Sequence, residues 1–344
     1  MNGAGRQALC ALAVAATLTS CDGIQSMTGG DGFHGQQFIG LFALFMGVTG
    51  LFYVAVALFL AVSLLRVYRA PQDRRTDPGR PGPGRAERGL MRALLGWTGL
   101  ILVGLSVLTI GSYLADRNSA RAAAAPAKLK ITITAHQWWW EVEYQDPSPF
   151  NIFRTANELH LPRGIPVDIT LRSDDVIHSF WAPNLAGKQD LIPGRSGEIR
   201  SIASHDGLYR AECAEFCGVQ HAHMALDVTV QSPVEFTAWT DSRRAPAAAP
   251  ESSLAAAGQD YFMKRECAAC HSISGTSARG SIGPDLTHFA GRRSIAAGTY
   301  PMTRGHLYGW VADPQSAKPG NRMPVLALNA AELHALVAYL ETLR

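Results

Sequence analysis

Two long apolar segments constrain the fold of this chain more than any other feature. Residues 38–65 carry no charged side chain, and residues 94–114 are interrupted only by small polar residues. A membrane-spanning helix needs about 20 such residues. Charged residues make up only 17% of the 344-residue chain, below the roughly 25% typical of soluble domains. The sequence therefore predicts two membrane-spanning helices and disfavours the alternative of buried helices in a soluble core.

The segment between the two apolar stretches indicates their orientation. Residues 66–92 hold eight arginines and three acidic residues, with many prolines and glycines that argue against regular structure. A short arginine-rich loop stays on the cytoplasmic side of a membrane. The sequence thus predicts a transmembrane hairpin within residues 21–127, with both chain ends outside the cytoplasm.

The N-terminus resembles an export signal. Residues 1–20 combine Arg6 with a short apolar core. The residues before Cys21, L-T-S, resemble a bacterial lipoprotein cleavage site, so Cys21 is a lipidation candidate. A leader that is uncleaved, or cleaved in the ordinary way, is the alternative.

From residue 128 the apolar pattern changes to a period of two. The stretches L-K-I-T-I-T, V-D-I-T-L-R and M-A-L-D-V-T-V alternate apolar and polar residues between Pro and Gly positions. They predict a small antiparallel β-sandwich over residues 128–240. An Ala/Pro-rich linker, residues 241–253, could then reach about 40 Å when extended. Residues 254–344 show helical patterns, and Asn329 with Glu332 forms a capping-box signal for the last helix.

The stretch C-A-E-F-C-G-V-Q-H-A-H-M, which starts at Cys213, concentrates metal-binding side chains. A disulfide between Cys213 and Cys217 would persist outside the cytoplasm, but it would not explain the ordered His221 and Met224. Zinc has little use for a thioether, whereas thiolate, imidazole and thioether together suit copper. A single blue-copper site needs one cysteine, so two thiolates suggest two bridged copper ions. Such a site requires a second histidine upstream, and His178 is the candidate.

These residues and three further segments resemble subunit II of haem–copper cytochrome c oxidases. The segments are A-H-Q-W-W-W-E-V-E-Y, S-D-D-V-I-H-S-F-W-A-P and K-Q-D-L-I-P-G-R, and the resemblance covers roughly residues 35–240. It implies a cupredoxin-like sandwich that holds a dinuclear CuA centre. The side-chain ligands that it implies are His178, Cys213, Cys217, His221 and Met224.

The same resemblance gives roles to Glu215 and Trp138. Glu215 would offer its backbone carbonyl to copper, and its carboxylate would face a magnesium or manganese ion shared with subunit I. Trp138 matches the position at which electrons enter; the alternative is that it only packs or lies at the membrane interface. Residues 38–65 lack the acidic residue with which some family members feed a proton channel.

A second cofactor is indicated by C-A-A-C-H, the attachment pattern of c-type haem. Cys267 and Cys270 would bond the porphyrin covalently, and His271 would be the proximal ligand. The following G-P-D-L and C-terminal helix resemble an all-α class I cytochrome c. Met323, in K-P-G-N-R-M-P, is the candidate sixth ligand, with Met302 as the alternative. His–Met ligation raises the haem potential and suits electron transfer.

The resemblance therefore implies a multi-domain membrane protein that is subunit II of a cytochrome c oxidase with a fused cytochrome c, residues 254–344. Electrons would pass from cytochrome c or the bc complex to haem c, then to CuA, and on to subunit I, which reduces dioxygen and pumps protons. Subunit III is a further expected partner, nucleic acid is not, and the expected location is the bacterial inner membrane with both cofactor domains periplasmic. Residues 131–240 hold seven basic and fourteen acidic residues, whereas residues 254–344 hold nine and six. These opposite charges favour docking of the two domains.

Two other functions remain open from the sequence. The chain could be the electron-input subunit of a CuA-containing nitric oxide reductase. It could also be a membrane-tethered electron carrier without a catalytic partner, although one anchor would suffice for that role.

Overall fold

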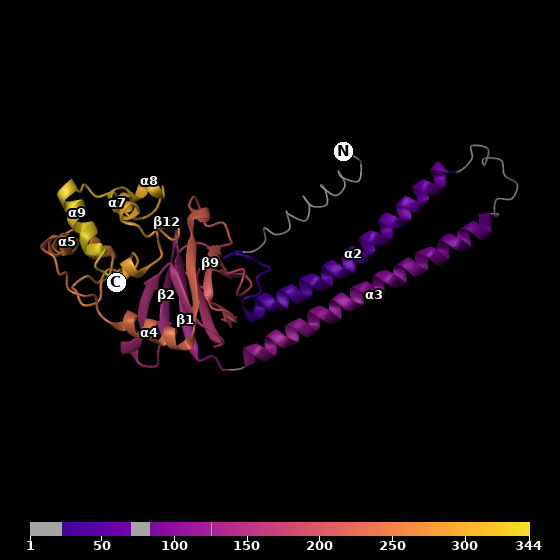
Figure 1. Ribbon diagram of the computed structural model, residues 1–344, viewed down its shortest axis with the longest axis horizontal. Helices are drawn as coiled ribbons and strands as arrows, with labels where there is room; N and C mark the ends of the chain where they lie inside the picture. Colours follow the sequence, from indigo (N-terminus) through magenta and orange to yellow (C-terminus); the bar gives the residue numbers. More distant parts are fainter. Residues whose placement is uncertain (1–22, 70–82, 125) are drawn as a thin grey trace, which may run out of the picture. The chain divides into compact units, whose positions relative to one another are not determined.

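The computed structural model describes residues 23–69, 83–124 and 126–344 (Figure 1). These residues form two compact units. One contains the chain up to Gln36 and from Ala125 onward, and the other is Gln37–Ala124. The predicted export signal, Cys21 and much of the arginine-rich loop lie outside the described residues.

Two long helices, α2 (Phe33–Tyr68) and α3 (Pro83–Ala124), carry the apolar segments. Each is long and apolar enough to cross a membrane, and large side chains such as Leu51 and Phe59 are mostly exposed along α2. Both helices extend beyond the apolar segments, and the residues that flank these segments are also helical. Along their contact, a side chain added at Gly104 would come within 2.8 Å of the Phe52 ring, so the small residue permits close approach.

Ten strands form a sandwich of two five-stranded sheets (Figure 1). The first sheet has the order β3-β2-β1-β5-β8 and consists of β3 (Phe153–Ala156), β2 (Trp139–Gln145), β1 (Leu129–His136), β5 (Val167–Ser173) and β8 (Gly197–Ser201). The second has the order β4-β10-β9-β6-β7 and consists of β4 (Glu158–Pro162), β10 (Ala225–Gln231), β9 (Gly207–Cys213), β6 (His178–Trp181) and β7 (Gln189–Leu191). The β1–β5 and β4–β10 pairs are parallel, which differs from the expected antiparallel arrangement. Residue alternation predicts the buried face of a strand but not the direction of its neighbour.

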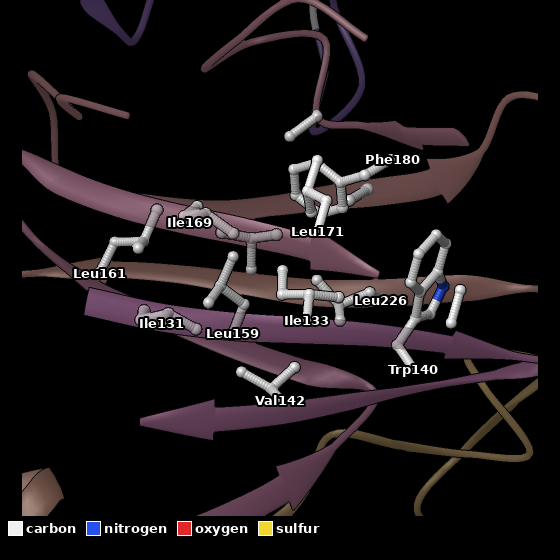
Figure 2. Packing of buried hydrophobic residues seen from close by; sticks show 14 of the residues in the cluster. Ile131, Ile133, Trp140, Val142, Leu159, Leu161, Ile169, Leu171, Phe180 and Leu226 are labelled. Atoms are coloured by element: carbon white, nitrogen blue, oxygen red, sulfur yellow. The ribbon is translucent and has the colours of Figure 1, made fainter. Parts of the chain in front are cut away.

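The core of the sandwich lies between these two sheets. Alternate residues of each strand point inward, as the period of two predicts, and Figure 2 shows these side chains meeting between the strands. Ile133 and Leu171 of the first sheet and Leu226 of the second are fully buried. This packing fixes the ends of β6 and β9, from which the metal-binding candidates extend.

The segment before α2 is bound to the edge of the sandwich. The backbone N–H groups of Asp31 and Gly32 both donate to the carbonyl of Asn184, at 3.0 and 3.1 Å. A side chain at Gly32 would lie 2.3 Å from the carbonyl oxygen of Leu185, so glycine allows this close approach. The beginning of α2 is therefore anchored to the sandwich by main-chain hydrogen bonds.

The sandwich is followed by a helix that the sequence pattern did not predict. Helix α4 (Pro233–Arg244) begins with a capping box formed by Ser232 and Glu235. This S-x-x-E signal was available in the sequence, but the expected end of the sandwich at residue 240 lies inside the helix. We call residues 126–244 the sandwich domain and residues 245–344 the C-terminal domain. The linker after α4 is bound to the C-terminal domain, since Ala247 N–H donates to Ser274 O at 3.0 Å.

Short helices surround a second core in the C-terminal domain. They are α5 (Ser253–Lys264), α6 (Cys267–Cys270), α7 (Arg304–Ala312), α8 (Pro314–Ala317) and α9 (Ala330–Leu340). Helix α9 begins with the predicted capping box of Asn329 and Glu332, which is thereby confirmed. A short hairpin of β11 (Ser294–Ile295) and β12 (Tyr300–Pro301) departs from the expected all-α architecture.

Candidate metal centre and haem pocket

Three buried side chains from different parts of the sandwich domain meet at one end of its second sheet. His178 begins β6, Cys213 ends β9, and Cys217 follows in the loop toward β10. Their ligand atoms all lie within 4.8 Å of one another. The structure thus brings together residues that are 35 positions apart in the chain.

The two cysteines form the middle of this site, and each has an imidazole beside it. The two Sγ atoms are 3.7 Å apart and are not bonded to each other. Nδ1 of His178 lies 3.8 Å from the Cys213 sulfur, and Nδ1 of His221 lies 3.7 Å from the Cys217 sulfur. A pair of sulfurs with one nitrogen on each side is the donor set that two soft copper ions would use.

Two weaker donors complete the arrangement. The thioether sulfur of Met224 lies 3.9 Å from the Cys217 sulfur. The backbone carbonyl oxygen of Glu215 lies 3.2 Å from the Cys213 sulfur. All six predicted copper-binding groups are therefore adjacent, and each sulfur has one nitrogen and one weaker donor nearby.

The electrostatics of the cysteine pair also fit a bound cation. Interaction with Cys217 lowers the pKa of the Cys213 thiol, while the same interaction raises the pKa of the Cys217 thiol. The protein alone thus favours one thiolate and opposes the second, because two adjacent negative charges repel. A metal between the sulfurs would remove this conflict, since a coordinating thiol is deprotonated.

Asp175 orients His178, and sequence analysis did not identify it. Its Oδ1 lies 2.8 Å from Nε2 of His178, and its Oδ2 accepts a hydrogen bond from the backbone N–H of Gln137 at 2.7 Å. Burial opposes protonation of His178, but the Cys213 sulfur and the Asp175 carboxylate outweigh it and raise the pKa of the imidazole. A carboxylate behind a ligand histidine fixes the ring so that the other nitrogen faces the metal. An acidic residue three positions before the histidine was the available signal.

Two polar residues between Cys213 and Met224 are exposed to solvent. The side chain of Glu215 is exposed. His223 is also exposed, and its Nδ1 lies 2.8 Å from Oε1 of Gln220. The structure therefore places His221, and not His223, beside the cysteines.

A cavity of about 620 Å³ is lined mostly by the C-terminal domain and in part by the sandwich domain, and its size is within the range of cofactor pockets. It is lined by the predicted attachment and axial residues Cys267, Cys270, His271 and Met323. Met302 instead packs against the hydrophobic core of the domain. The chemistry of this lining fits a covalently attached haem with one imidazole and one thioether ligand.

His271 is held in the orientation that an axial ligand needs. Its Nδ1 lies 2.8 Å from the carbonyl oxygen of Pro284, so this nitrogen donates to the carbonyl and Nε2 is left for a metal. A side chain at Gly283 would lie 2.7 Å from Cε1 of His271, which explains the glycine. Burial lowers the pKa of His271 and favours the neutral imidazole that binds iron.

Trp138 lies between the cavity and the cysteine pair. It lines the cavity, only 8% of its surface is exposed, and its Nε1 donates to the carbonyl oxygen of Cys217 at 3.0 Å. The Gln137 side chain donates to the same oxygen at 2.7 Å. Trp138 is therefore enclosed between the two candidate cofactor sites.

Two protein families match the two domains of this chain that carry these residues. The family described as "Cytochrome C oxidase subunit II, periplasmic domain" matches residues 146–231, and the cytochrome c family matches residues 255–344. The periplasmic domain of subunit II of cytochrome oxidase from Bradyrhizobium japonicum, a solved structure, is 29% identical over 35% of this chain and 96% of that chain, with a TM-score of 0.33.

Similarity to curated relatives extends over most of the chain. Cytochrome c oxidase subunit 2 of Bacillus subtilis is 32% identical over 259 residues, which are 71% of each protein. Cytochrome c oxidase subunit 2 of Alkalihalophilus pseudofirmus is 30% identical over 334 residues, which are 95% of this chain and 94% of that protein. This chain therefore belongs to the cytochrome c oxidase subunit 2 family and carries a cytochrome c domain at its C-terminus.

Proposed function

We propose that this chain is the electron-input subunit of a respiratory cytochrome c oxidase. It would take electrons from cytochrome c or the bc complex and pass them to subunit I, which reduces dioxygen to water and pumps protons. When bound, haem c and the dinuclear CuA centre supply the reversible one-electron chemistry that amino-acid side chains lack. The chain's own residues bind these groups, exclude water from them and set the path between them.

The copper site would be held by His178, Cys213, Cys217, His221, Met224 and the backbone carbonyl of Glu215. Its burial at the end of the packed second sheet supports a rigid site, because little rearrangement is then needed when the charge of the copper pair changes. Haem c would be attached through Cys267 and Cys270, with His271 and Met323 as axial ligands.

The position of Trp138, between the candidate haem cavity and the candidate copper site, carries this proposal. Trp138 lines the candidate haem cavity and also donates a hydrogen bond to the backbone of a candidate copper ligand, Cys217. The C-terminal domain thus contacts a residue that is hydrogen-bonded to the candidate copper site, which supports its role as the electron donor. We propose that electrons enter the copper site through Trp138, from the chain's own haem.

The surface that contacts subunit I would lie on residues 213–224, which we call the copper-binding loop. The exposed carboxylate of Glu215 follows Cys213 by two residues, and Phe216 next to it is 75% exposed. An apolar side chain beside a free carboxylate suits a protein interface that also holds a hard cation. We propose that Glu215 contributes to a magnesium or manganese site shared with subunit I, and that subunit III joins the same complex.

The exposed apolar surfaces of α2 and α3 support anchoring in the bacterial inner membrane. Both helices would span the bilayer, with the arginine-rich loop in the cytoplasm and the two cofactor domains in the periplasm. Lipidation of Cys21 would add a further anchor, and mass spectrometry of the mature N-terminus tests it.

The function is tested on the complex purified in mild detergent. Optical and EPR spectra should show low-spin haem c and a mixed-valence dicopper signal, and the complex should consume oxygen when supplied with reduced cytochrome c. Consumption of nitric oxide without oxygen uptake would show the reductase alternative instead. Isolation without a large polytopic partner would show a free electron carrier, and zinc in place of copper would overturn the proposal.

A further inference from the structure

Lys318 lies buried where the C-terminal domain contacts the sandwich domain. Only 2% of its surface is exposed, although lysine is almost never fully buried without partners. Its Nζ donates to the carbonyl oxygens of Trp138 at 2.7 Å, His223 at 2.6 Å and Ala296 at 3.1 Å. An ammonium group has three donor hydrogens, so the three main-chain carbonyls can satisfy all of them.

The acceptors of Lys318 connect it to both candidate cofactor sites. Trp138 is hydrogen-bonded to the backbone of Cys217, and His223 directly precedes Met224 in the copper-binding loop. Lys318 itself begins the segment that leads to Met323. One side chain therefore connects the segment of the candidate haem ligand to Trp138 and to the loop that carries most of the candidate copper ligands.

A turn with unusual backbone angles makes a second contact to the copper-binding loop. Ala296, Ala297 and Gly298, between β11 and β12, have φ angles of 53°, 56° and 76°. The left-handed region costs roughly 1–2 kcal/mol for a residue with a side chain, so two consecutive alanines there need support from their surroundings. The carbonyl of Ala297 accepts from the backbone N–H of Ala225 at 2.9 Å.

This second contact is made by main-chain atoms of the turn, and Lys318 also bonds to the turn through the carbonyl of Ala296. Ala225 directly follows Met224, so the turn bonds to the main chain next to a candidate copper ligand. The Arg210 side chain also donates to the carbonyl of Gly298, at 3.3 Å. Ala297 is 1% exposed. The turn is thus built into the contact between the domains.

We propose that Lys318 and residues 296–298, together called the interdomain latch, hold the C-terminal domain permanently docked on the copper-binding loop. The inference rests on the proposed function and adds that the fused haem domain is a fixed donor, not a tethered domain that swings to its acceptor. Lys318 is a positioning residue: it sets the separation and orientation of haem c and the copper pair. Because the docked domain encloses Trp138, an external donor must deliver its electron to the C-terminal domain.

The test uses the complete detergent-solubilised complex and the variant Lys318→Met. Methionine keeps the apolar stem of the side chain but leaves three buried carbonyls without their donor. Lys264→Met is the matched control, because Lys264 is an exposed lysine of the same domain that pairs with Asp260 on the surface of α5. A photoactivated ruthenium complex reduces haem c, and the transfer of one electron from the ferrous haem to the oxidised copper pair is followed optically; no bond is made or broken in that step.

For Lys318→Met we expect at least a tenfold slower transfer and a broader haem–copper distance distribution by pulsed EPR, with both cofactor spectra retained. Lys264→Met should match the unaltered complex in both measurements. If Lys318→Met behaves like Lys264→Met, the latch is refuted. Missing cofactor spectra or absent electron transfer in the unaltered complex would instead refute the proposed function.

A second measurement needs no variant and covers the case in which Lys318→Met does not fold. The transfer rate in the unaltered complex is measured as glycerol raises the solvent viscosity about fivefold. A docked donor gives a rate that does not change with viscosity, since no domain has to move. A rate that falls in proportion to viscosity would show a swinging domain and overturn the inference.

Discussion

Asp175 Oδ1 lies 2.8 Å from Nε2 of His178, and the same carboxylate reaches the C-terminal domain. Its Oδ2 is 3.5 Å from Nη2 of Arg322, the residue before the candidate haem ligand Met323. One carboxylate thus orients a candidate copper ligand and pairs with the neighbour of a candidate haem ligand. The two sites are therefore linked through side chains as well as through the main chain.

Replacing Asp175 with alanine should weaken copper binding about 10–100-fold, the usual cost of losing the group that orients a metal-bound histidine. The His178 ring would then be free to rotate away from the sulfurs. Copper content after competition with a chelator and the hyperfine pattern of the EPR signal measure the effect. Asp174→Ala is the control, because its carboxylate is largely exposed and pairs with His136 instead. Equal copper retention in the two variants would contradict the orienting role.

Trp138→Phe should slow electron transfer from haem c to the copper pair at least tenfold. The substitution keeps an aromatic ring in the cavity wall but removes the hydrogen bond from Nε1 to the Cys217 carbonyl. Trp139→Phe is the matched control, since Trp139 lines the same cavity but stacks on His136 at a ring distance of 4.3 Å. Flash photoreduction of the complex separates the two outcomes: similar rates for both variants would exclude Trp138 as the path.

The parts of this architecture that depend on neighbouring residues could be predicted from the sequence. Each of three features can be recognised within one short stretch of sequence. They are the apolar segments, the C-A-A-C-H pentapeptide and the twelve-residue cluster from Cys213 to Met224. The capping box of α9 is of the same kind. His178 needed one further argument, namely that two bridged copper ions require a second imidazole.

Contacts between distant segments could not be predicted in this way. Lys318 and Trp138 are separated by 180 positions, and no local pattern distinguishes a buried lysine from a solvated one. The parallel β1–β5 pair also depends on the tertiary fold. The Ala/Pro composition of the linker gave only the length that it could reach when extended, and the hydrogen bond from Ala247 to Ser274 of the domain that it precedes could not be predicted from it.

The choice between the two methionines near the haem cavity is directly testable. Met323→Leu should remove the methionine–iron charge-transfer band and lower the haem c reduction potential, because a thioether ligand raises that potential. Met302→Leu should leave both properties unchanged, since Met302 packs in the core. Redox titration of the intact complex with optical detection measures both variants. The opposite result would make Met302 the axial ligand.

Stability in acid should depend on Glu158, a buried carboxylate of β4. Burial opposes its ionisation, but the hydrogen bond to His160 and the charge of Arg292 outweigh burial and lower the pKa of Glu158 to about 2. Arg292 belongs to the C-terminal domain, and its Nε lies 3.8 Å from Oε1 of Glu158. This pair therefore joins the two domains through charges that are both removed from water.

The direction of the pH effect follows from the lowered pKa. The ionised carboxylate stabilises the folded protein above pH 4.5, and this stability is lost as the pH falls from 4.5 through 2. The shift from 4.5 to about 2 corresponds to about 3 kcal/mol. Unfolding of the intact protein, followed by fluorescence between pH 6 and 2.5, should show this loss, and Glu158→Gln should be less stable at pH 6 but lose less on acidification. Glu251→Gln, at an exposed position of the linker, is the control, and the role of the pair is disproved if both variants follow the same acid profile.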